Sequence, residues 1–134
     1  MKREARSHDD DTIRRYVEAT SAADGDAAAS LTTEDVVIEL PGGAVLHGHE
    51  GARQFAAKHA EDDGRRQAVT LSAIDAAAPG RFVLTLVMSS REVASGELLY
   101  SMDVGSIVEV RDGLVARHRV FPSPQEAAVA AQAD

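Results

Sequence analysis

Hydrophobic positions recur with a helical period in two stretches of the first half of the chain. In the first stretch, four residues follow an i, i+3, i+4, i+7 spacing: Ile13, Tyr16, Val17 and Thr20. Three aspartates at residues 9–11 precede them, where a helix start favours negative charge. The second stretch covers residues 48–60, and its apolar face includes Ala52, Phe55, Ala56 and His59. Between the two, Gly25 suits a helix stop and Asp26 can cap a short helix over residues 27–32.

Alternating apolar and polar positions predict strands in the rest of the chain. The predicted strands cover residues 36–40, 44–47, 69–74, 82–88, 98–110 and 114–121. Residues 41–43, Pro-Gly-Gly, separate the first two strands, and residues 111–113, Arg-Asp-Gly, predict a tight hairpin turn between the last two.

The order of these elements predicts the fold class. Helices gather early and strands late, which favours an α+β fold over a wound parallel sheet. A chain of 134 residues is long enough for one domain with a real core and an internal cavity. We assign this domain to residues 8–122, with a flexible N-terminal arm at residues 1–7 and a C-terminal tail at residues 123–134. In the tail, residues 125–131 form either a final helical turn or a frayed end.

Composition and charge narrow the functions that the domain can have. The net charge of −8 argues against nucleic acid and anionic membranes as partners, because binding to phosphates needs a basic surface. The absence of cysteine excludes disulfides, thiolate metal sites and a cysteine nucleophile. No apolar run approaches the roughly 18 residues of a membrane span, and the polar start lacks the apolar stretch of a signal peptide. We therefore expect a cytoplasmic protein.

Three segments resemble a known family: IRRYVEATSAADGDAAASLTTEDVVIELPGG, LHGHEGARQFAA and GSIVEVRDGLVARHRVF. They are similar to the SnoaL-like branch of the nuclear transport factor 2 superfamily, which includes steroid Δ-isomerases, polyketide cyclases and limonene-epoxide hydrolases. The resemblance covers about residues 8–122. It implies a cone-shaped barrel, in which a strongly curved, mixed and mostly antiparallel sheet is covered by three helices. It also implies an apolar pocket, no metal or other cofactor, and a homodimer joined through the outer face of the sheet.

Compared with the steroid isomerases, this chain keeps one of the two hydrogen-bond donors to the enolate oxygen and lacks the aspartate base. In that family, a tyrosine after an arginine in the first helix donates a hydrogen bond to the enolate oxygen, and Arg15-Tyr16 matches it. The position of the aspartate base, directly before a proline, is Leu40 here. The second donor position holds Ser106. Because leucine cannot accept a proton, the resemblance does not predict a standard steroid isomerase.

Other branches of the superfamily place acid–base residues on the last strand. The epoxide hydrolases have an aspartate where this chain has Arg119, so their water-activating triad is not expected here. The polyketide cyclases have an acid–base residue at a position that matches His118. This histidine shares a predicted face with Val120, and either it faces the pocket as an acid or base, or it is a core or dimer-surface residue that a neighbour satisfies.

The candidate site therefore combines two catalytic candidates with a set of lining residues. Tyr16 and His118 are the catalytic candidates, although Tyr16 could instead serve only in packing. The expected lining residues are Leu40, Phe55, Met88, Tyr100, Met102, Ser106 and Val120. Ser106 and Tyr100 could each orient a ligand or be bonded internally. Strict alternation turns Asp103 outward, and only a bulge at Gly105 would make it a pocket acid.

Two classes of function remain open at this point. The first is an isomerase, cyclase or dehydratase that acts on an apolar, carbonyl-containing metabolite, with Tyr16 holding the oxygen and His118 moving the proton. The second is a non-catalytic binding or dimerisation domain, which Leu40 at the base position favours. His47 and His49 form an H-x-H pair, but a metal site would need a third ligand, and the resemblance implies no metal.

Overall fold

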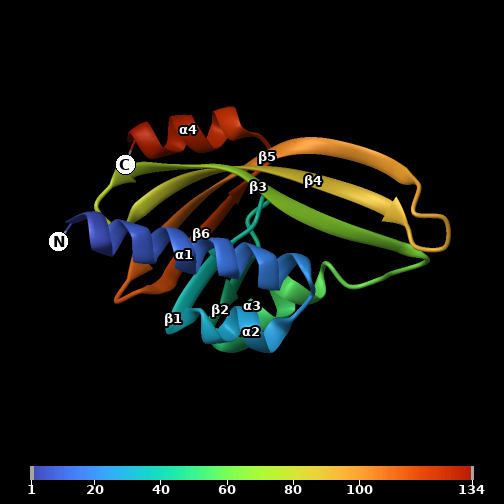
Figure 1. Ribbon diagram of the computed structural model, residues 1–134, viewed down its shortest axis with the longest axis horizontal. Helices are drawn as coiled ribbons and strands as arrows, with labels where there is room; N and C mark the ends of the chain where they lie inside the picture. The colour runs from blue at the N-terminus through green and yellow to red at the C-terminus, as the bar shows by residue number, and fades with distance from the viewer. Residues whose placement is uncertain (1, 134) are drawn as a thin grey trace.

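The protein folds around one curved, open sheet with helices on both of its faces (Figure 1). The computed structural model describes the backbone of residues 2–133 and the side chains of residues 8–133. The helices are α1 Lys2–Ser21, α2 Gly25–Ser30, α3 Gly48–Ala57 and α4 Pro124–Ala133. The strands are β1 Thr32–Glu39, β2 Val45–His47, β3 Arg65–Ala78, β4 Arg81–Glu92, β5 Leu98–Arg111 and β6 Leu114–Phe121.

The sheet has the mixed, mostly antiparallel character that was expected. Its strand order is β2-β1-β6-β5-β4-β3, and β1 runs parallel to β6 while the other neighbours are antiparallel. Asp112 and Gly113 have φ values of 54° and 76°, which confirms the tight turn between β5 and β6. Register shifts in β3 let the long strands bend, because a bulge adds a local kink and twist. The α+β prediction is confirmed.

The concave face of the sheet carries the core. The fully buried side chains on it come from separate elements, and they include Val36, Ile38, Phe82, Leu84 and Val108. Helix α1 adds Ile13 and Tyr16 from the stripe that the sequence predicted. Burial of these apolar side chains supplies the main drive for the helices to cover the sheet.

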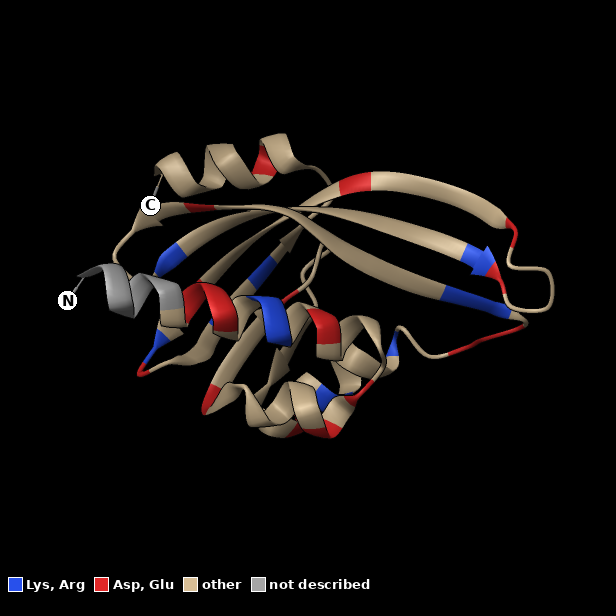
Figure 2. Ribbon diagram, viewed as in Figure 1, with Lys and Arg blue, Asp and Glu red and all other residues tan. Residues whose placement is uncertain are grey.

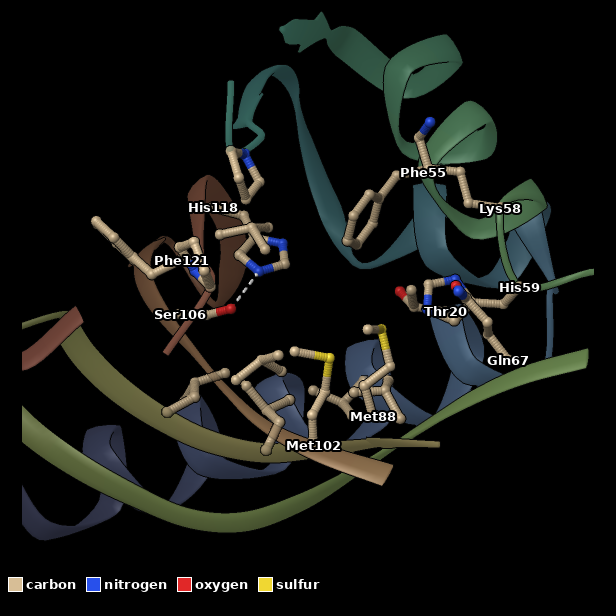
Figure 3. Close-up of a pocket in the computed structure, with 18 of the residues that line it drawn as sticks. Thr20, Phe55, Lys58, His59, Gln67, Met88, Met102, Ser106, His118 and Phe121 are labelled. Atoms are coloured by element: carbon tan, nitrogen blue, oxygen red, sulfur yellow. Dashed lines mark hydrogen bonds between the residues drawn. The ribbon is translucent and has the colours of Figure 1, made fainter. Parts of the chain in front are cut away.

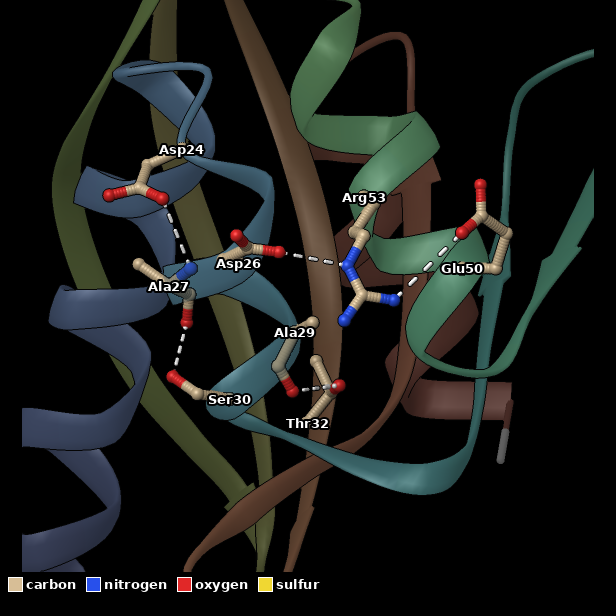
Figure 4. Close-up of polar contacts among 8 residues, drawn as sticks. All are labelled: Asp24, Asp26, Ala27, Ala29, Ser30, Thr32, Glu50 and Arg53. Carbon is tan, nitrogen blue, oxygen red and sulfur yellow. Dashed lines mark hydrogen bonds and ion pairs between the residues drawn. The ribbon is translucent and has the colours of Figure 1, made fainter.

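Helix α2 and its N-cap begin two residues earlier than predicted. Asp24, rather than Asp26, accepts a hydrogen bond at 3.1 Å from the backbone N–H of Ala27 (Figure 4). Asp26 instead accepts a hydrogen bond at 3.0 Å from Arg53 of α3. This pair links α2 to α3 at the surface, and Arg53 also lies 3.8 Å from Glu50 within α3. Each such exposed pair adds little stability.

Both ends of the chain differ from the expected domain boundaries. The backbone of α1 is helical from Lys2, through the residues expected to form an arm. The C-terminal tail contains a ten-residue helix, α4, which lies on the sheet face opposite α1 (Figure 1). Its Ala127 is fully buried against β5, where Gly105 lies beneath the helix and Ile107 is also fully buried. Helix α4 therefore covers part of the outer face. The homodimer that was expected to form through this face stays a prediction.

Charged residues are prominent along α1 and near the ends of β3 and β4 (Figure 2). The ion pairs between strands lie on the outer face, where Arg117 donates to Glu39 at 2.7 Å and Arg111 to Asp35 at 2.7 Å. No helix in the described part of the chain is sufficiently long and apolar to cross a membrane.

The packing of α4 against β5 can be tested with the substitution Gly105→Val. A Cβ atom at this position would lie 2.8 Å from the Cβ of Ala127 and 2.9 Å from the backbone of Pro124 and Ser123. Because those contacts are mainly with backbone, we expect a loss of about 1–3 kcal/mol in the free energy of unfolding, measured by urea denaturation. Ser101→Val, on the same face but exposed, is the control and should change stability by less than about 0.5 kcal/mol. Equal stability of both variants would contradict this packing.

Candidate functional site

An apolar cavity of about 300 Å³ lies between the concave face of the sheet and the helices. Strands β4 and β5 supply one wall through Leu84, Leu86, Met88, Met102 and Val104 (Figure 3). Helix α1, Phe55 of α3, and the end of β6 supply the rest. Met102 is 43% exposed, so the cavity reaches solvent beside it. Of the described residues that line it, Lys58 is the only lysine or arginine, and none is an aspartate or a glutamate.

A buried chain of hydrogen bonds joins the three polar residues that the sequence placed in the pocket. The hydroxyl of Tyr16 lies 2.9 Å from Nδ1 of His118, and Nε2 of the same ring lies 2.9 Å from Oγ of Ser106 (Figure 3 shows the second bond). The exposed fractions are 1% for Tyr16, 6% for His118 and 3% for Ser106. We name these residues the Tyr16–His118–Ser106 chain.

Local structure explains why these three side chains meet. In the β5–β6 ladder, Val108 pairs with His118 and Ser106 pairs with Val120, so Ser106 is a diagonal neighbour of His118 on the same face. Tyr16 reaches the pair from α1, 102 positions away in the sequence. The ring of Phe55 closes the group with its edge contact to His118, at a centroid distance of 5.2 Å.

The chain is electrically neutral near pH 7. Burial lowers the pKa of His118 to about 4, because an imidazolium would lose its hydration there. Burial also raises the pKa of the Tyr16 phenol well above its usual value, for the corresponding reason. A neutral imidazole offers one donor and one acceptor.

Two proton arrangements satisfy both ring nitrogens. In one, Tyr16 donates to Nδ1 and Nε2–H donates to Ser106, which leaves the serine hydrogen free. In the other, Ser106 donates to Nε2 and Nδ1–H donates to Tyr16, which leaves the phenol hydrogen free. Both hydroxyl-bearing residues line the cavity. The chain therefore presents one free hydroxyl donor to a mainly apolar cavity in either arrangement.

Most of the predicted lining residues reach the cavity, and three candidates do not. Phe55, Met88, Met102 and Val120 line it as expected. Leu40 packs against the core, while the neighbouring Pro41 contacts the cavity. Tyr100 is 44% exposed and accepts a hydrogen bond from Gln67 at 3.2 Å, outside the cavity.

Asp103 lies on the outer face of the sheet, as strict alternation predicts. It pairs with Val87, and the β4–β5 register is regular on both sides of Gly105. Without a bulge, its carboxylate stays on the outer face, and Asp103 does not line the cavity.

The opposite end of the cavity holds polar residues that sequence reasoning did not assign to it. Thr20, His59 and Gln67 lie together there, away from His118 and Ser106 (Figure 3). Burial lowers the pKa of His59, against the raising influence of the carbonyl groups of Phe55 and Ala56. Thr20 and His59 both belong to the predicted apolar helix faces. The presence of a polar residue on each apolar face was the feature of the sequence that could have indicated this part of the cavity.

The H-x-H pair does not form part of a metal centre. Nε2 of His49 lies 3.2 Å from the carbonyl oxygen of Thr32. Within the described range of the chain, no group of three histidine, aspartate, glutamate or cysteine side chains could hold a metal ion.

Comparisons with solved structures show that the chain shares its fold with several proteins. A candidate polyketide cyclase from Xanthomonas campestris pv. campestris is 22% identical, with a TM-score of 0.67, over 95% of this chain and 98% of that chain. An LEH-like epoxide hydrolase from M. tuberculosis is 14% identical, with a TM-score of 0.68, over 95% and 93%. A candidate ketosteroid isomerase from Kribbella flavida is 20% identical, with a TM-score of 0.67, over 86% and 77%.

No curated protein matches the chain. The model of the SnoaL-like domain matches residues 13–118, which is most of the chain and includes every residue that lines the cavity except Val120, Phe121 and Pro122. This protein therefore belongs to the SnoaL-like domain family, within the nuclear transport factor 2-like superfamily.

Proposed function

We propose that the cavity binds an apolar metabolite with a carbonyl group, and that the Tyr16–His118–Ser106 chain holds the carbonyl oxygen. The observation that carries this proposal is the free hydroxyl donor that the chain offers at an end of the cavity where the nearby lining, such as Phe55, Val104 and Val120, is apolar. A hydrogen bond to a carbonyl is strong in such surroundings because water does not compete for it. The donor stays neutral, so the ligand needs no charge of its own.

The same chain limits the chemistry that the site can perform. Both ring nitrogens of His118 are already bonded, and its lowered pKa makes it a weak base at pH 7. Complete proton transfer from the chain to a ligand would leave a buried phenolate on Tyr16 or an alkoxide on Ser106, which is costly. Polarisation of a carbonyl oxygen by hydrogen bonding is therefore the step that the site supports best.

Binding can be tested with 2-acetylnaphthalene and its hydrocarbon counterpart 2-isopropylnaphthalene. We expect wild-type protein to favour the ketone by about tenfold in Kd, corresponding to about one hydrogen bond. In the triple variant Tyr16→Phe/Ser106→Ala/His118→Leu, which removes every donor of the chain, the preference should vanish while hydrocarbon affinity changes by less than about twofold. Isothermal titration calorimetry would measure both. Ser101→Ala, exposed on the other face of β5, is the control, and a ketone preference that survives in the triple variant would refute the proposal.

A second candidate function is acid–base catalysis of the isomerase, cyclase or dehydratase kind. The continuous hydrogen-bond path from Tyr16 through His118 to Ser106 favours it, since a proton can be redistributed along the path. In this function, His118 would release one of its two bonds and exchange a proton with the substrate. Leu40 at the position of the family base favours binding alone.

Exchange of hydrogen at the carbons beside a ketone separates catalysis from binding. For a catalyst, bound 2-acetylnaphthalene in D2O should lose its methyl-proton NMR signal faster with wild-type protein than with buffer. His118→Ala should abolish the acceleration and keep ligand affinity within about tenfold. Full acceleration in that variant would remove His118 from the mechanism. Binding without acceleration in wild-type protein would favour the non-catalytic reading.

The neutral state of His118 predicts a pH dependence of stability. Its pKa is about 4 in the folded protein and about 6.5 when unfolded, so only the unfolded chain takes up this proton between those values. Stability should therefore fall as the pH drops from about 6.5 to about 4, by about 3 kcal/mol for this group. Urea denaturation across this range should show a shallower loss for His118→Gln. A parallel decline in both proteins would contradict the assignment.

A further inference from the structure

The end of the cavity opposite His118 contains two polar side chains that are buried and unpaired. Thr20 is 3% exposed and His59 is 7% exposed. Neither Oγ1 of Thr20 nor Nδ1 of His59 has a hydrogen-bond partner within the described part of the protein. Both residues line the cavity, and Figure 3 shows them side by side with Gln67.

Such groups are unusual in a protein interior. A buried donor or acceptor without a partner costs free energy, and most such groups in folded proteins are paired. Thr12 of the same helix meets this requirement. Thr12, two turns earlier on α1, donates from its hydroxyl to the carbonyl of Gly113 at 3.0 Å. Thr20 and His59 instead keep their capacity for a partner in the cavity.

Burial has a larger effect on His59 than the nearby charges of Arg66 and Lys58, so a neutral partner suits this end of the cavity. The amine of Lys58 points away from Thr20 and His59, so mainly its aliphatic stem faces them (Figure 3). Burial keeps His59 uncharged at neutral pH. A hydroxyl group suits the pair, because it can donate to one of them and accept from the other.

Phe55 sets the distance between the two polar ends. Its ring makes edge contacts with both histidines, at centroid distances of 5.2 Å to His118 and 5.9 Å to His59. The intervening wall consists of apolar side chains such as Met88 and Met102. A ligand that reaches both ends must therefore have an apolar middle of about one or two rings.

We propose that Thr20 and His59 form a second polar subsite, which binds a hydroxyl group at the far end of a ligand whose carbonyl lies at the Tyr16–His118–Ser106 chain. Gln67 borders this subsite. Its amide nitrogen donates a hydrogen bond to the hydroxyl of Tyr100, and this bond orients its amide oxygen. This inference rests on the proposed function, and it narrows the ligand to an apolar hydroxyketone. The family comparison assigns no role to either residue.

The test compares three ligands with one skeleton: 2-acetylnaphthalene, 6-acetyl-2-naphthol and 6-acetyl-2-naphthoic acid. We expect the naphthol to bind wild-type protein about tenfold more tightly than the unsubstituted ketone, as measured by calorimetry. In Thr20→Val the advantage should fall to about twofold or less, and in His59→Leu it should fall similarly. Thr20→Val keeps the side-chain shape and removes an unpaired hydroxyl, so its melting temperature should equal or exceed that of wild-type protein.

Thr12→Val is the matched control on the same helix. It loses a hydrogen bond outside the cavity, so it should lower the melting temperature and leave the naphthol advantage intact. Equal affinity of wild-type protein for the naphthol and the ketone would overturn the subsite while leaving the carbonyl site standing. Tightest binding of the naphthoic acid would overturn the neutral-hydroxyl assignment. Failure of all three ligands to bind would overturn both the subsite and the proposed function.

Discussion

The buried imidazole of His118 has two ring nitrogens that must be satisfied away from bulk water, and the arrangement of the cavity depends on this requirement. Tyr16 meets it from α1 and Ser106 meets it from β5, each at 2.9 Å. The bonds therefore fix the helix above the sheet and align both hydroxyl groups with the cavity. An unpaired nitrogen here would carry the full desolvation cost, so the three side chains act as one unit.

Neutrality separates this site from an acid–base centre with a carboxylate. No aspartate or glutamate is among the described residues that line the cavity, and burial keeps both His118 and Tyr16 uncharged. A carboxylate would bring charge that an apolar ligand does not need, together with its own desolvation cost. The site is therefore suited to recognise oxygen by hydrogen bonding, at one end through Tyr16 and Ser106, and at the other, as we infer, through Thr20 and His59.

The outer face of the sheet carries a helix and ion pairs in place of a cavity. Helix α4 lies on it, with Ala127 against Gly105, and the ion pairs of Arg117 and Arg111 lie nearer β1. Small residues permit the close approach of α4, because any side chain on Gly105 would meet the helix backbone. The two faces of β5 thus have different roles. Met102, Val104, Ser106 and Val108 line the cavity or the core, whereas Gly105 and Ile107 support a helix.

Periodicity in the sequence determined the fold class, the face of α1 that carries Tyr16, and the shared face of Ser106 and His118. These follow from spacings of 3.6 and 2 residues, which are local properties of the chain. Alternation also placed Asp103 outward correctly. Only the tertiary structure decided that Tyr16 bonds to His118, that Pro41 rather than Leu40 reaches the cavity, and that Thr20 and His59 share its far end. Those relations join elements far apart in sequence, and sheet curvature and helix placement set them, so no local spacing encodes them.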